Sequence, residues 1–291
     1  MRSKRKAHIL GVHTSVARGL DRSVAEAKEK GCQTWQIFSR NPRGWATQPL
    51  SGEIVRLFRE ARGNHGLGPC IIHGCYLINL AATDPLVRER SIATFRQELE
   101  RSVLLGADYL VIHPGSARGK SPDEAINMAG AAVREAVSGF EDALWKSGVT
   151  ILIENTAGQG GQIGRSFEEV RDIIDCSGDL PLGMCLDTAH RFAAGYDWRS
   201  ARRSSEAMKL LGETVGFERV KAIHFNDSKS AFGSQVDRHW HIGEGQIGGA
   251  GLSRVINHPR LRGLPFILET PEDSIRRDVD NLATARSLGT A

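Results

Sequence analysis

Histidines and carboxylates end one short apolar run after another in this sequence, and both residue types can bind metal ions or transfer protons. A single residue of this kind is more often a hydrogen-bonded polar side chain than a ligand, but six successive runs end this way. The six residues lie 33 to 45 positions apart and are His73, His113, Glu154, Asp187, His224 and Glu269. Burying three imidazoles and three carboxylates together is unfavourable unless they are paired, and metal ions would pair them. The pattern therefore predicts a multinuclear metal site.

Two short motifs add further candidate ligands. Asp187 and His190 are three residues apart, so both would face one cavity if a helix begins there. Asp237 and His239 are two residues apart, and alternate residues of an extended segment share a side. The nine candidates are too many for one Zn²⁺, which takes about four ligands, and they suit two or three ions with a bridging carboxylate. This ligand set favours Zn²⁺, with Mn²⁺ or Fe²⁺ as alternatives, and clustered divalent ions typically promote attack on phosphodiesters.

The elements that must position these residues alternate between short apolar runs and longer amphipathic stretches. The runs are rich in Ile, Val and Leu, as expected of strands buried on both faces. They cover residues 7–13, 33–38, 70–73, 109–113, 149–154, 182–187, 220–224 and 265–269. The helical stretches between them cover residues 18–30, 51–64, 85–105, 122–146, 167–175, 197–211, 249–257 and 274–288.

This alternation predicts an α/β protein built from parallel βα units. Either an open doubly wound sheet or a closed (β/α)8 TIM barrel would satisfy it. The candidate ligands decide between the two, because strand ends converge on one mouth only in a barrel. We therefore expect a single (β/α)8 TIM barrel with the metal site at its C-terminal mouth.

Composition is that of an ordinary globular protein, with 291 residues, 40% hydrophobic residues and 25% charged residues. It excludes collagen, coiled coil and wholesale disorder. A net charge of +4 neither identifies nor excludes nucleic acid as a partner.

We expect a frayed basic tail over 1–6, then one catalytic domain over 7–291, without a signal peptide or a transmembrane helix. The five cysteines are expected to be free thiols, mostly buried, in a monomeric cytoplasmic protein.

The sequence also resembles endonuclease IV, the zinc-dependent apurinic/apyrimidinic (AP) endonuclease family of base excision repair, also called AP endonuclease family 2. The resemblance runs from about His13 to Thr270. The resemblance rests on residues 73–80, 113–116, 153–160, 186–197, 224–229, 237–239, 243–248 and 267–270. Sugar isomerases of similar barrel type share the strand-end carboxylates but not this set. Two departures are Gly74, where the family often has Asp or Ala, and Ala189, where it usually has Cys.

The resemblance implies a role for each candidate ligand. It implies cleavage of the phosphodiester 5′ to an abasic site in duplex DNA, which leaves a 3′-hydroxyl and a 5′-deoxyribose phosphate. Activity on blocked 3′ ends is also implied. Glu154 would orient or activate the attacking hydroxide, and Glu269 is the second candidate for that task. The implied ligands are His73, His113 and Glu154 for a first zinc, Glu154, Asp187, His224 and Glu269 for a second, and His190, Asp237 and His239 for a third.

The segment 39–45, Ser-Arg-Asn-Pro-Arg-Gly-Trp, is the main candidate for DNA contact. Taken alone, it is a solvated loop about as often as a binding loop, but at the barrel mouth it predicts a minor-groove reader. By resemblance, Arg43 and Tyr76 would insert into the DNA at the lesion, while Asn41 and Trp45 would shape the loop. The candidates for phosphate contact are Lys229, Arg238 and Arg118.

Residues 243–248 match the G-x-G-x-x-G pattern of dinucleotide sites. The match does not follow an apolar strand and is not in a first βαβ unit, so we expect a structural turn and no nucleotide cofactor.

Two other functions fit parts of the pattern. One is a sugar isomerase or epimerase with one or two Mn²⁺ ions on the same barrel, which would need fewer ligands and no DNA-inserting loop. The other is a non-catalytic protein that binds damaged DNA, which would not need the complete ligand set.

Overall fold

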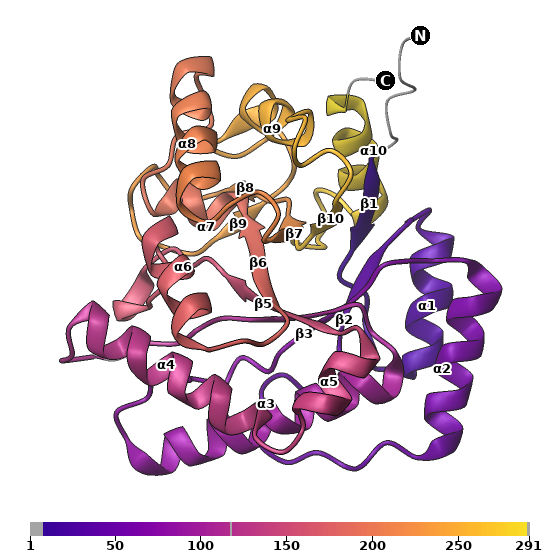
Figure 1. The fold of residues 1–291 in the computed structure, drawn as a ribbon. Helices are drawn as coiled ribbons and strands as arrows, with labels where there is room; N and C mark the ends of the chain where they lie inside the picture. The colour runs from indigo at the N-terminus through magenta and orange to yellow at the C-terminus, as the bar shows by residue number, and fades with distance from the viewer. Residues whose placement is uncertain (1–7, 117, 290–291) are drawn as a thin grey trace, which may run out of the picture.

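Eight parallel strands form the centre of the protein, as predicted. The structure is a computed structural model and describes residues 8–116 and 118–289; the expected tail over 1–6 lies outside this range. The sheet order is β1-β10-β7-β6-β5-β4-β3-β2, and all of its pairs are parallel (Figure 1). The strands are β1 (Ile9–Val12), β2 (Trp35–Phe38), β3 (Cys70–His73), β4 (Tyr109–Ile112), β5 (Thr150–Glu154), β6 (Leu182–Asp187), β7 (Val220–His224) and β10 (Pro265–Leu268).

Contacts between β1 and β2 close the sheet into a barrel. His13 forms an isolated parallel bridge with Gln36, and the Thr14 amide donates to the Gln36 carbonyl over 2.8 Å. The Gln33 amide donates to the Leu10 carbonyl over the same distance. The predicted TIM barrel is therefore confirmed over the described residues.

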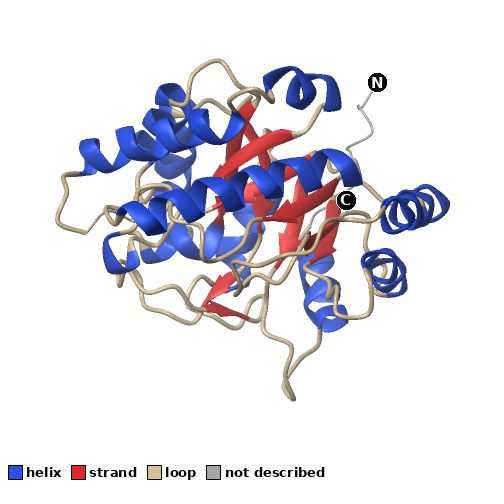
Figure 2. Cartoon of the chain, turned by 90° about the horizontal axis from the view of Figure 1, so that it is seen from below, coloured by secondary structure: helices blue, strands red, loops and turns tan. Residues whose placement is uncertain are grey.

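Helices surround the strands on the outside of the barrel (Figure 2). Most begin where a Ser or Asp side chain accepts a hydrogen bond from the first helical turn, as Ser51, Asp84 and Ser121 do. The helices are α1 (Leu20–Glu29), α2 (Gly52–His65), α3 (Pro85–Leu105), α4 (Pro122–Val137), α5 (Glu141–Ser147), α6 (Phe167–Cys176), α7 (Thr188–Ala193), α8 (Ala201–Thr214), α9 (Gly248–Ile256) and α10 (Asp278–Leu288), with a short 3₁₀ turn η1 (Gln159–Gly161).

The expectation of one helix over 122–146 is wrong, because the chain turns between α4 and α5. Gly139 has a φ of 72°, a left-handed conformation that other residues rarely adopt, and the Phe140 amide closes the turn on the Val137 carbonyl at 2.7 Å. A two-stranded antiparallel ribbon, β8 (Asp227–Ser228) with β9 (His239–Trp240), lies beyond the end of β7.

Inside the barrel, a layer of apolar side chains lies directly beneath the candidate ligands. Each member precedes a strand-end His, Glu or Asp by two positions, and alternate residues of a strand point to the same face. The ligands therefore point into the barrel, one level closer to the mouth. The apolar layer consists of Ile71, Val111, Leu152, Cys185, Ala222 and Ile267, all fully buried.

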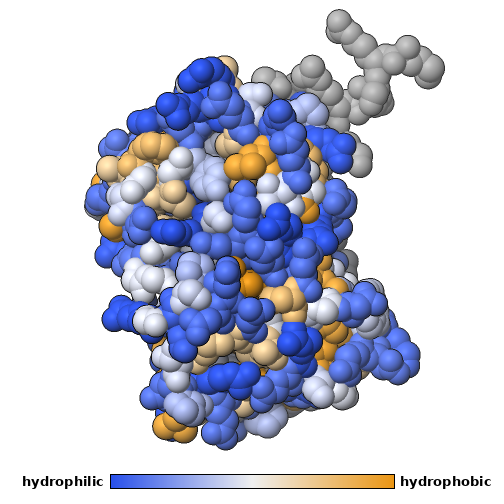
Figure 3. Space-filling model, turned by 60° about the vertical axis from the view of Figure 1, so that its left-hand side comes forward, coloured by the Kyte–Doolittle hydropathy of each residue, from blue (hydrophilic) through white to orange (hydrophobic). Residues whose placement is uncertain are grey.

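The face of the protein shown in Figure 3 is mostly hydrophilic, as expected of a globular protein, and the cysteines are free, as expected from the sequence. On the face in Figure 3, hydrophilic side chains predominate and apolar ones form small separate groups. No helix within the described residues has the length and apolar character that crossing a bilayer requires. The five cysteines are free, and four of them are buried while Cys176 is half-buried.

Candidate metal centre

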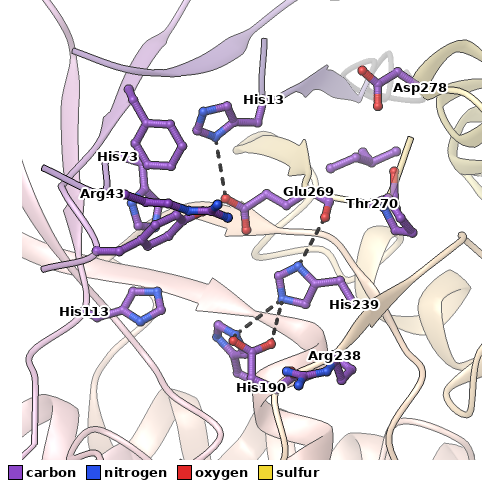
Figure 4. Close-up of a pocket in the computed structure, with 15 residues that line it drawn as sticks. His13, Arg43, His73, His113, His190, Arg238, His239, Glu269, Thr270 and Asp278 are labelled. Carbon is purple, nitrogen blue, oxygen red and sulfur yellow. Dashed lines mark hydrogen bonds and ion pairs between the residues drawn. The ribbon is translucent and has the colours of Figure 1, made fainter. Parts of the chain in front are cut away.

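A cavity of about 680 Å³ opens at the C-terminal ends of the strands. Histidines from different strands and loops line it together with Glu269, and Figure 4 shows them facing one another. Arg43 lies on the side of His73, and Arg238 lies on the side of His190 (Figure 4). The lining histidines are His13, His73, His113, His190 and His239.

The candidate ligands form three clusters in which the ligand atoms lie within 4.8 Å of one another. Asp237 joins the cluster that contains His190 and His239, since its oxygens lie 3.1 Å from His190 Nε2 and 3.5 Å from His239 Nε2. All nine side chains predicted from the sequence are therefore brought together at the mouth. Asp187 belongs to two clusters, whereas the resemblance placed it in one. The clusters are His73, His113 and Glu154; Glu154, Asp187, His224 and Glu269; and Asp187, His190 and His239.

Glu154 lies at the centre of this arrangement. Its Oε2 atom is 3.1 Å from His113 Nε2 and 3.4 Å from His73 Nε2. Its Oε1 atom is 3.0 Å from His224 Nδ1 and 3.1 Å from His190 Nδ1. Both oxygens are buried, and neither has a hydrogen-bond partner of acceptable geometry. A buried carboxylate without hydrogen bonds is strongly destabilising unless cations satisfy it, so the site fits bridged divalent ions.

Backbone carbonyls fix the orientation of two of the imidazoles. His73 Nδ1 donates to the Gly74 carbonyl at 2.8 Å, which leaves Nε2 facing Glu154. His190 Nδ1 lies 2.9 Å from the Asn155 carbonyl, and its Nε2 faces the third cluster. A hydrogen bond on one ring nitrogen fixes the tautomer and directs the other nitrogen to a metal ion.

Gln36 orients the second cluster, although sequence reasoning did not select it. Its Oε1 atom accepts from His224 Nε2 at 2.8 Å, and its Nε2 atom donates to Glu269 Oε1 at 2.6 Å. The same Nε2 atom lies 3.0 Å from His13 Nδ1. Gln36 thus directs His224 Nδ1 and the Glu269 carboxylate toward Glu154. The one available signal was a polar residue between two apolar ones, Trp35 and Ile37.

Two buried asparagines hold Asp187, and both were also missed. Asn155 accepts from the Asp187 amide at 2.9 Å and donates to its carbonyl at 3.1 Å. Asn226 donates to Asp187 Oδ2 at 2.7 Å and accepts from the Glu269 amide at 2.8 Å. Each follows a ligand within two positions, at Glu154 and at His224, which is the signal that could have identified them.

The charges of the cluster shift the pKa values of its members in opposite directions. Burial disfavours the charged form of His190, but the carboxylates of Asp187 and Asp237 outweigh it and hold the pKa well above 6.5. Burial would likewise raise the pKa of the Glu154 carboxyl, but His224 and His113 hold it well below 4.5. Perturbed groups of this kind concentrate at functional sites.

His224, Glu269 and Asp237 follow the same pattern. For His224, the effect of burial is outweighed by Cys185, Glu154 and Glu269, so its pKa is well above 6.5. The effect of burial on Glu269 is outweighed chiefly by His224, so its pKa is well below 4.5. The charge of His190 lowers the pKa of Asp237 in the same way, against burial. Without metal ions, protons on these imidazoles balance the carboxylates.

The residues predicted to insert into DNA lie at the rim of the cavity. Arg43 and Tyr76 both line it, and 57% of the Tyr76 surface is exposed. The Tyr76 ring packs edge-on against Phe38 at 5.1 Å between centroids. Asn41 accepts from the Arg43 amide at 3.0 Å, which shapes the turn that carries Arg43.

The other predicted DNA contacts are more scattered. Arg238 lines the cavity, whereas Trp45 and Lys229 do not. The Lys229 ammonium lies 3.9 Å from the centre of the Trp240 ring, a cation–π contact that places it on the β8–β9 ribbon. Exposed Arg118 donates to the Gly160 carbonyl at 3.3 Å, in the glycine-rich segment after β5.

Residues 243–248 form a tight turn around the buried carboxylate of Asp227. The amides of Gly243, Gly245 and Ile247 donate to it over 3.0–3.1 Å. A Cβ atom at Gly245 would lie 2.4 Å from Asp227 Oδ1, so only glycine fits. These amides thus bind a carboxylate of the protein itself, which agrees with the expected structural turn. Asp227 also pairs with β9, the strand that begins with His239.

The two departures from the family pattern lie beside the clusters. At Gly74 the backbone carbonyl contacts His73, and a Cβ atom would lie 2.9 Å from Ile112 Cγ2. Ala189 is buried in α7, between Asp187 and His190.

Fold and site together define a class of protein: a (β/α)8 barrel whose strand ends carry a candidate multinuclear metal centre. The family model described as "Xylose isomerase-like TIM barrel" matches residues 24–288. Probable endonuclease 4 of Solibacter usitatus is 43% identical over 282 residues, which cover 96% of each chain. Probable endonuclease 4 of Methanoculleus marisnigri is 40% identical over 284 residues, 97% of this chain and 99% of the relative.

Solved structures agree with these relatives. The crystal structure of endonuclease IV from Thermus thermophilus has a TM-score of 0.83 at 38% identity and covers 96% of this chain and 98% of that one. A D-tagatose 3-epimerase-like protein, with a TM-score of 0.69 at 20% identity over 96% of this chain and 95% of its own, shares the fold. The chain belongs to the endonuclease IV family, AP endonuclease family 2.

Proposed function

We propose that the chain is a DNA repair endonuclease that hydrolyses the phosphodiester 5′ to an abasic site in duplex DNA. The products would be a 3′-hydroxyl and a 5′-deoxyribose phosphate. Beside family membership, the observation that carries this proposal is Glu154, whose two buried oxygens lie among four imidazoles without a hydrogen bond. Such a carboxylate is suited to bridging divalent ions rather than to a structural role.

The donor set suits three Zn²⁺ ions, with Mn²⁺ or Fe²⁺ as partial substitutes. When bound, the ions would supply hydroxide at neutral pH and stabilise the leaving alkoxide. The residues that would hold them are His73, His113 and Glu154; Glu154, Asp187, His224 and Glu269; and His190, Asp237 and His239, with Asp187 also near this third group.

The two glutamates would act on the attacking water. Glu154 is fixed from both sides by imidazoles, so its carboxylate can orient that water and accept its proton at a defined position. Glu269 is 16% exposed at its side chain and faces the cavity, where it is the second candidate for this task. Gln36 would hold the Glu269 carboxylate in place.

The rim residues would select the lesion. Arg43 and Tyr76 would enter the DNA where the base is missing, because an abasic nucleotide has no base to unstack. Asn41 and Trp45 would shape the loop that carries Arg43, as the bond from the Arg43 amide to Asn41 suggests. Lys229, Arg238 and Arg118 would contact phosphates, a sequence-independent contribution to binding.

Three further properties follow from the proposal. The enzyme would process blocked 3′ ends, since the same attack can be directed at a 3′-phosphodiester. It would need no nucleotide cofactor and no partner subunit, because every proposed ligand comes from one chain. It would work in the cytoplasm, associated with the DNA that it repairs.

A duplex with a single tetrahydrofuran site tests the proposal. The zinc-loaded protein should nick the strand on the 5′ side of the lesion and leave an undamaged duplex of the same sequence intact. Elemental analysis of the same sample should give about three metal ions per chain. The proposal fails if the loaded protein does not nick the lesion, and a single bound ion would contradict the nine-ligand assignment.

Glu154→Gln tests the role of the central carboxylate. The amide cannot accept a proton, so cleavage should be lost while binding to the lesion duplex, measured by fluorescence anisotropy, persists. Glu141→Gln, at an exposed position in α5, is the matched control and should cleave normally. Normal turnover by Glu154→Gln would remove Glu154 from the mechanism.

A further inference from the structure

The two loops that carry Arg43 and Tyr76 are joined at their bases. The Tyr76 amide donates to the Pro42 carbonyl at 3.0 Å, and the Cys75 thiol lies 3.1 Å from the same carbonyl. The loop after β2 and the loop after β3 therefore meet directly behind their exposed tips. Any group that holds this junction also sets the separation of the Arg43 and Tyr76 side chains.

Glu98 of α3 reaches both loops from below with one carboxylate. Its Oε2 atom accepts from the Ser39 hydroxyl at 2.6 Å, at the first residue after β2. Its Oε1 atom accepts from the Cys75 amide at 3.2 Å, at the second residue after β3. The Glu98 side chain is completely buried. No role in the metal centre explains a buried carboxylate at this position, since none of the three clusters includes it.

Two buried arginines complete the arrangement. Arg101, one helical turn after Glu98, donates through Nε to the Ser39 hydroxyl at 2.8 Å, through Nη2 to the Ser39 carbonyl and through Nη1 to the Gln48 carbonyl at 3.0 Å. Burial raises the pKa of the Glu98 carboxyl, and the Ser39 hydrogen bond and the charges of Arg40 and Arg101 oppose that rise. The Ser39 hydroxyl therefore donates to Glu98 and accepts from Arg101, and both of these residues belong to α3.

Arg40 holds the outer half of the same loop. It donates through Nη1 to Gln97 of α3 at 2.8 Å and through Nη2 to the Gly44 carbonyl at 3.2 Å and to the Trp45 carbonyl. The 39–50 segment contains no helix or strand, so these side chains supply partners that its carbonyls would otherwise lack. The result is a fixed backbone around an exposed Arg43 side chain.

We propose that Glu98, through its bonds to Ser39 and Cys75, is a positioning residue that holds the two DNA-probing loops in the arrangement that fits an abasic site. The inference rests on the proposed function, because it assigns Arg43 and Tyr76 to lesion recognition. Pre-ordered loops bind with a smaller entropic penalty than mobile ones, so the effect falls on DNA binding rather than on the hydrolytic step. Glu98 itself contacts neither DNA nor metal.

Glu98→Gln is the central test, because the amide keeps the size of the side chain and can accept from only one of its two partners. We expect KM for the tetrahydrofuran duplex to rise about tenfold while kcat stays within about twofold, the pattern of a lost positioning contact. Metal content should stay that of the wild type. The fluorescence of a 2-aminopurine placed opposite the lesion reports insertion of the loops. At equal protein concentration it should be lower with Glu98→Gln than with the wild type.

Glu100→Gln is the matched control, since Glu100 lies on the same helix and forms a surface ion pair with Arg96 at 2.8 Å. It should behave as the wild type. If Glu98→Gln does not fold, Ser39→Ala removes the hydroxyl that links Glu98 to Arg101 with a smaller change, and the same rise in KM is expected.

Each outcome decides one question. An unchanged KM in the folded variant, or a fall in kcat with KM unchanged, overturns the positioning role. Loss of bound metal together with activity would also overturn it, because the effect would then act through the metal centre. If the wild type itself does not nick the lesion duplex, the proposed function fails instead, and the wild-type lane of every assay shows which of the two has failed.

Discussion

Loading the metal centre should release protons from two imidazoles, His190 and His224. The ring nitrogens of His190 face acceptors on both sides, namely the Asn155 carbonyl at 2.9 Å and Asp237 Oδ2 at 3.1 Å. The same is true of His224, whose Nε2 faces Gln36 Oε1 at 2.8 Å and whose Nδ1 faces Glu154 Oε1 at 3.0 Å. Without metal, each ring is therefore best satisfied as an imidazolium, in agreement with its raised pKa.

The pH dependence of metal affinity follows from the number of protons that the two rings release. A metal ion binds the neutral imidazole, so each protonated ring must lose one proton when the site is filled. Between pH 6.5 and the raised pKa values, each released proton makes the apparent metal affinity rise about tenfold per pH unit, or ~1.4 kcal/mol. Because His224 and His190 belong to different proposed ions, the two effects combine to about a hundredfold per unit, or ~2.7 kcal/mol, in the product of the two binding constants.

Isothermal titration calorimetry in buffers of different ionisation enthalpy counts these protons. At about pH 8, where an ordinary histidine is neutral, Zn²⁺ added to the chelator-treated protein should still release protons from these two rings, in addition to the proton that a zinc-bound water would lose. In His190→Gln the release should fall by the contribution of one ring, while His65→Gln, outside the site at the end of α2, should match the wild type. Release of no protons at this pH, or an equal release from His190→Gln and the wild type, would refute the assignment.

The same protonation makes the stability of the metal-free protein depend on pH. The raised pKa values of His190 and His224 mean that their contribution is complete below pH 6.5 and is lost as pH rises through the folded values. The lowered pKa values of Glu154 and Glu269 mean that their contribution is present above about pH 4.5 and is lost in acid. The melting temperature of the metal-free protein should therefore fall above neutrality, whereas a melting temperature that rises steadily with pH would contradict these signs.

Three substitutions test other parts of the structure. Gln36→Leu should weaken zinc binding about 10- to 100-fold in a chelator competition, because the residue orients two ligands, and unchanged affinity would argue against that role. Gly245→Ala should lower the melting temperature, since its Cβ atom would lie 2.4 Å from Asp227 Oδ1; a melting temperature equal to that of the wild type would show that the turn can relax. Phe58→Ala should reduce the free energy of unfolding by ~3–5 kcal/mol in urea, because the ring is fully buried against Trp35, and a loss below ~1 kcal/mol would contradict this packing.

Much of the metal site was predictable because it follows from local rules. Side chains two apart on a strand share a face, so a His or Glu two positions beyond a buried apolar residue must also point into the barrel. Ile71 and His73 illustrate this on β3, and Leu152 and Glu154 illustrate it on β5. Asp187 begins α7 as its N-cap and accepts from the His190 amide at 2.6 Å, which explains the Asp187-to-His190 spacing.

Other features depend on contacts that no local pattern encodes. Gln36 meets His224 across 188 residues of sequence and meets Glu269 across 233, which requires the barrel to close through β1, so that β10 lies two strands from β2 and β7 three. Glu98 in turn looks like an ordinary residue of a long helix until the loops after β2 and β3 fold onto it.

The sequence by itself determined which chemistry is present and at which end of the strands it lies. Apolar runs that each end in a His, Asp or Glu imply parallel strands with ligands at one mouth, because strand periodicity and βα connection are local properties. Apart from what the family resemblance implied, the tertiary structure decided which ligands share a cluster, and it alone decided which groups orient them and what holds the rim loops. Those outcomes depend on barrel closure, which brings residues such as Gln36 and His224 within 2.8 Å although the chain separates them widely.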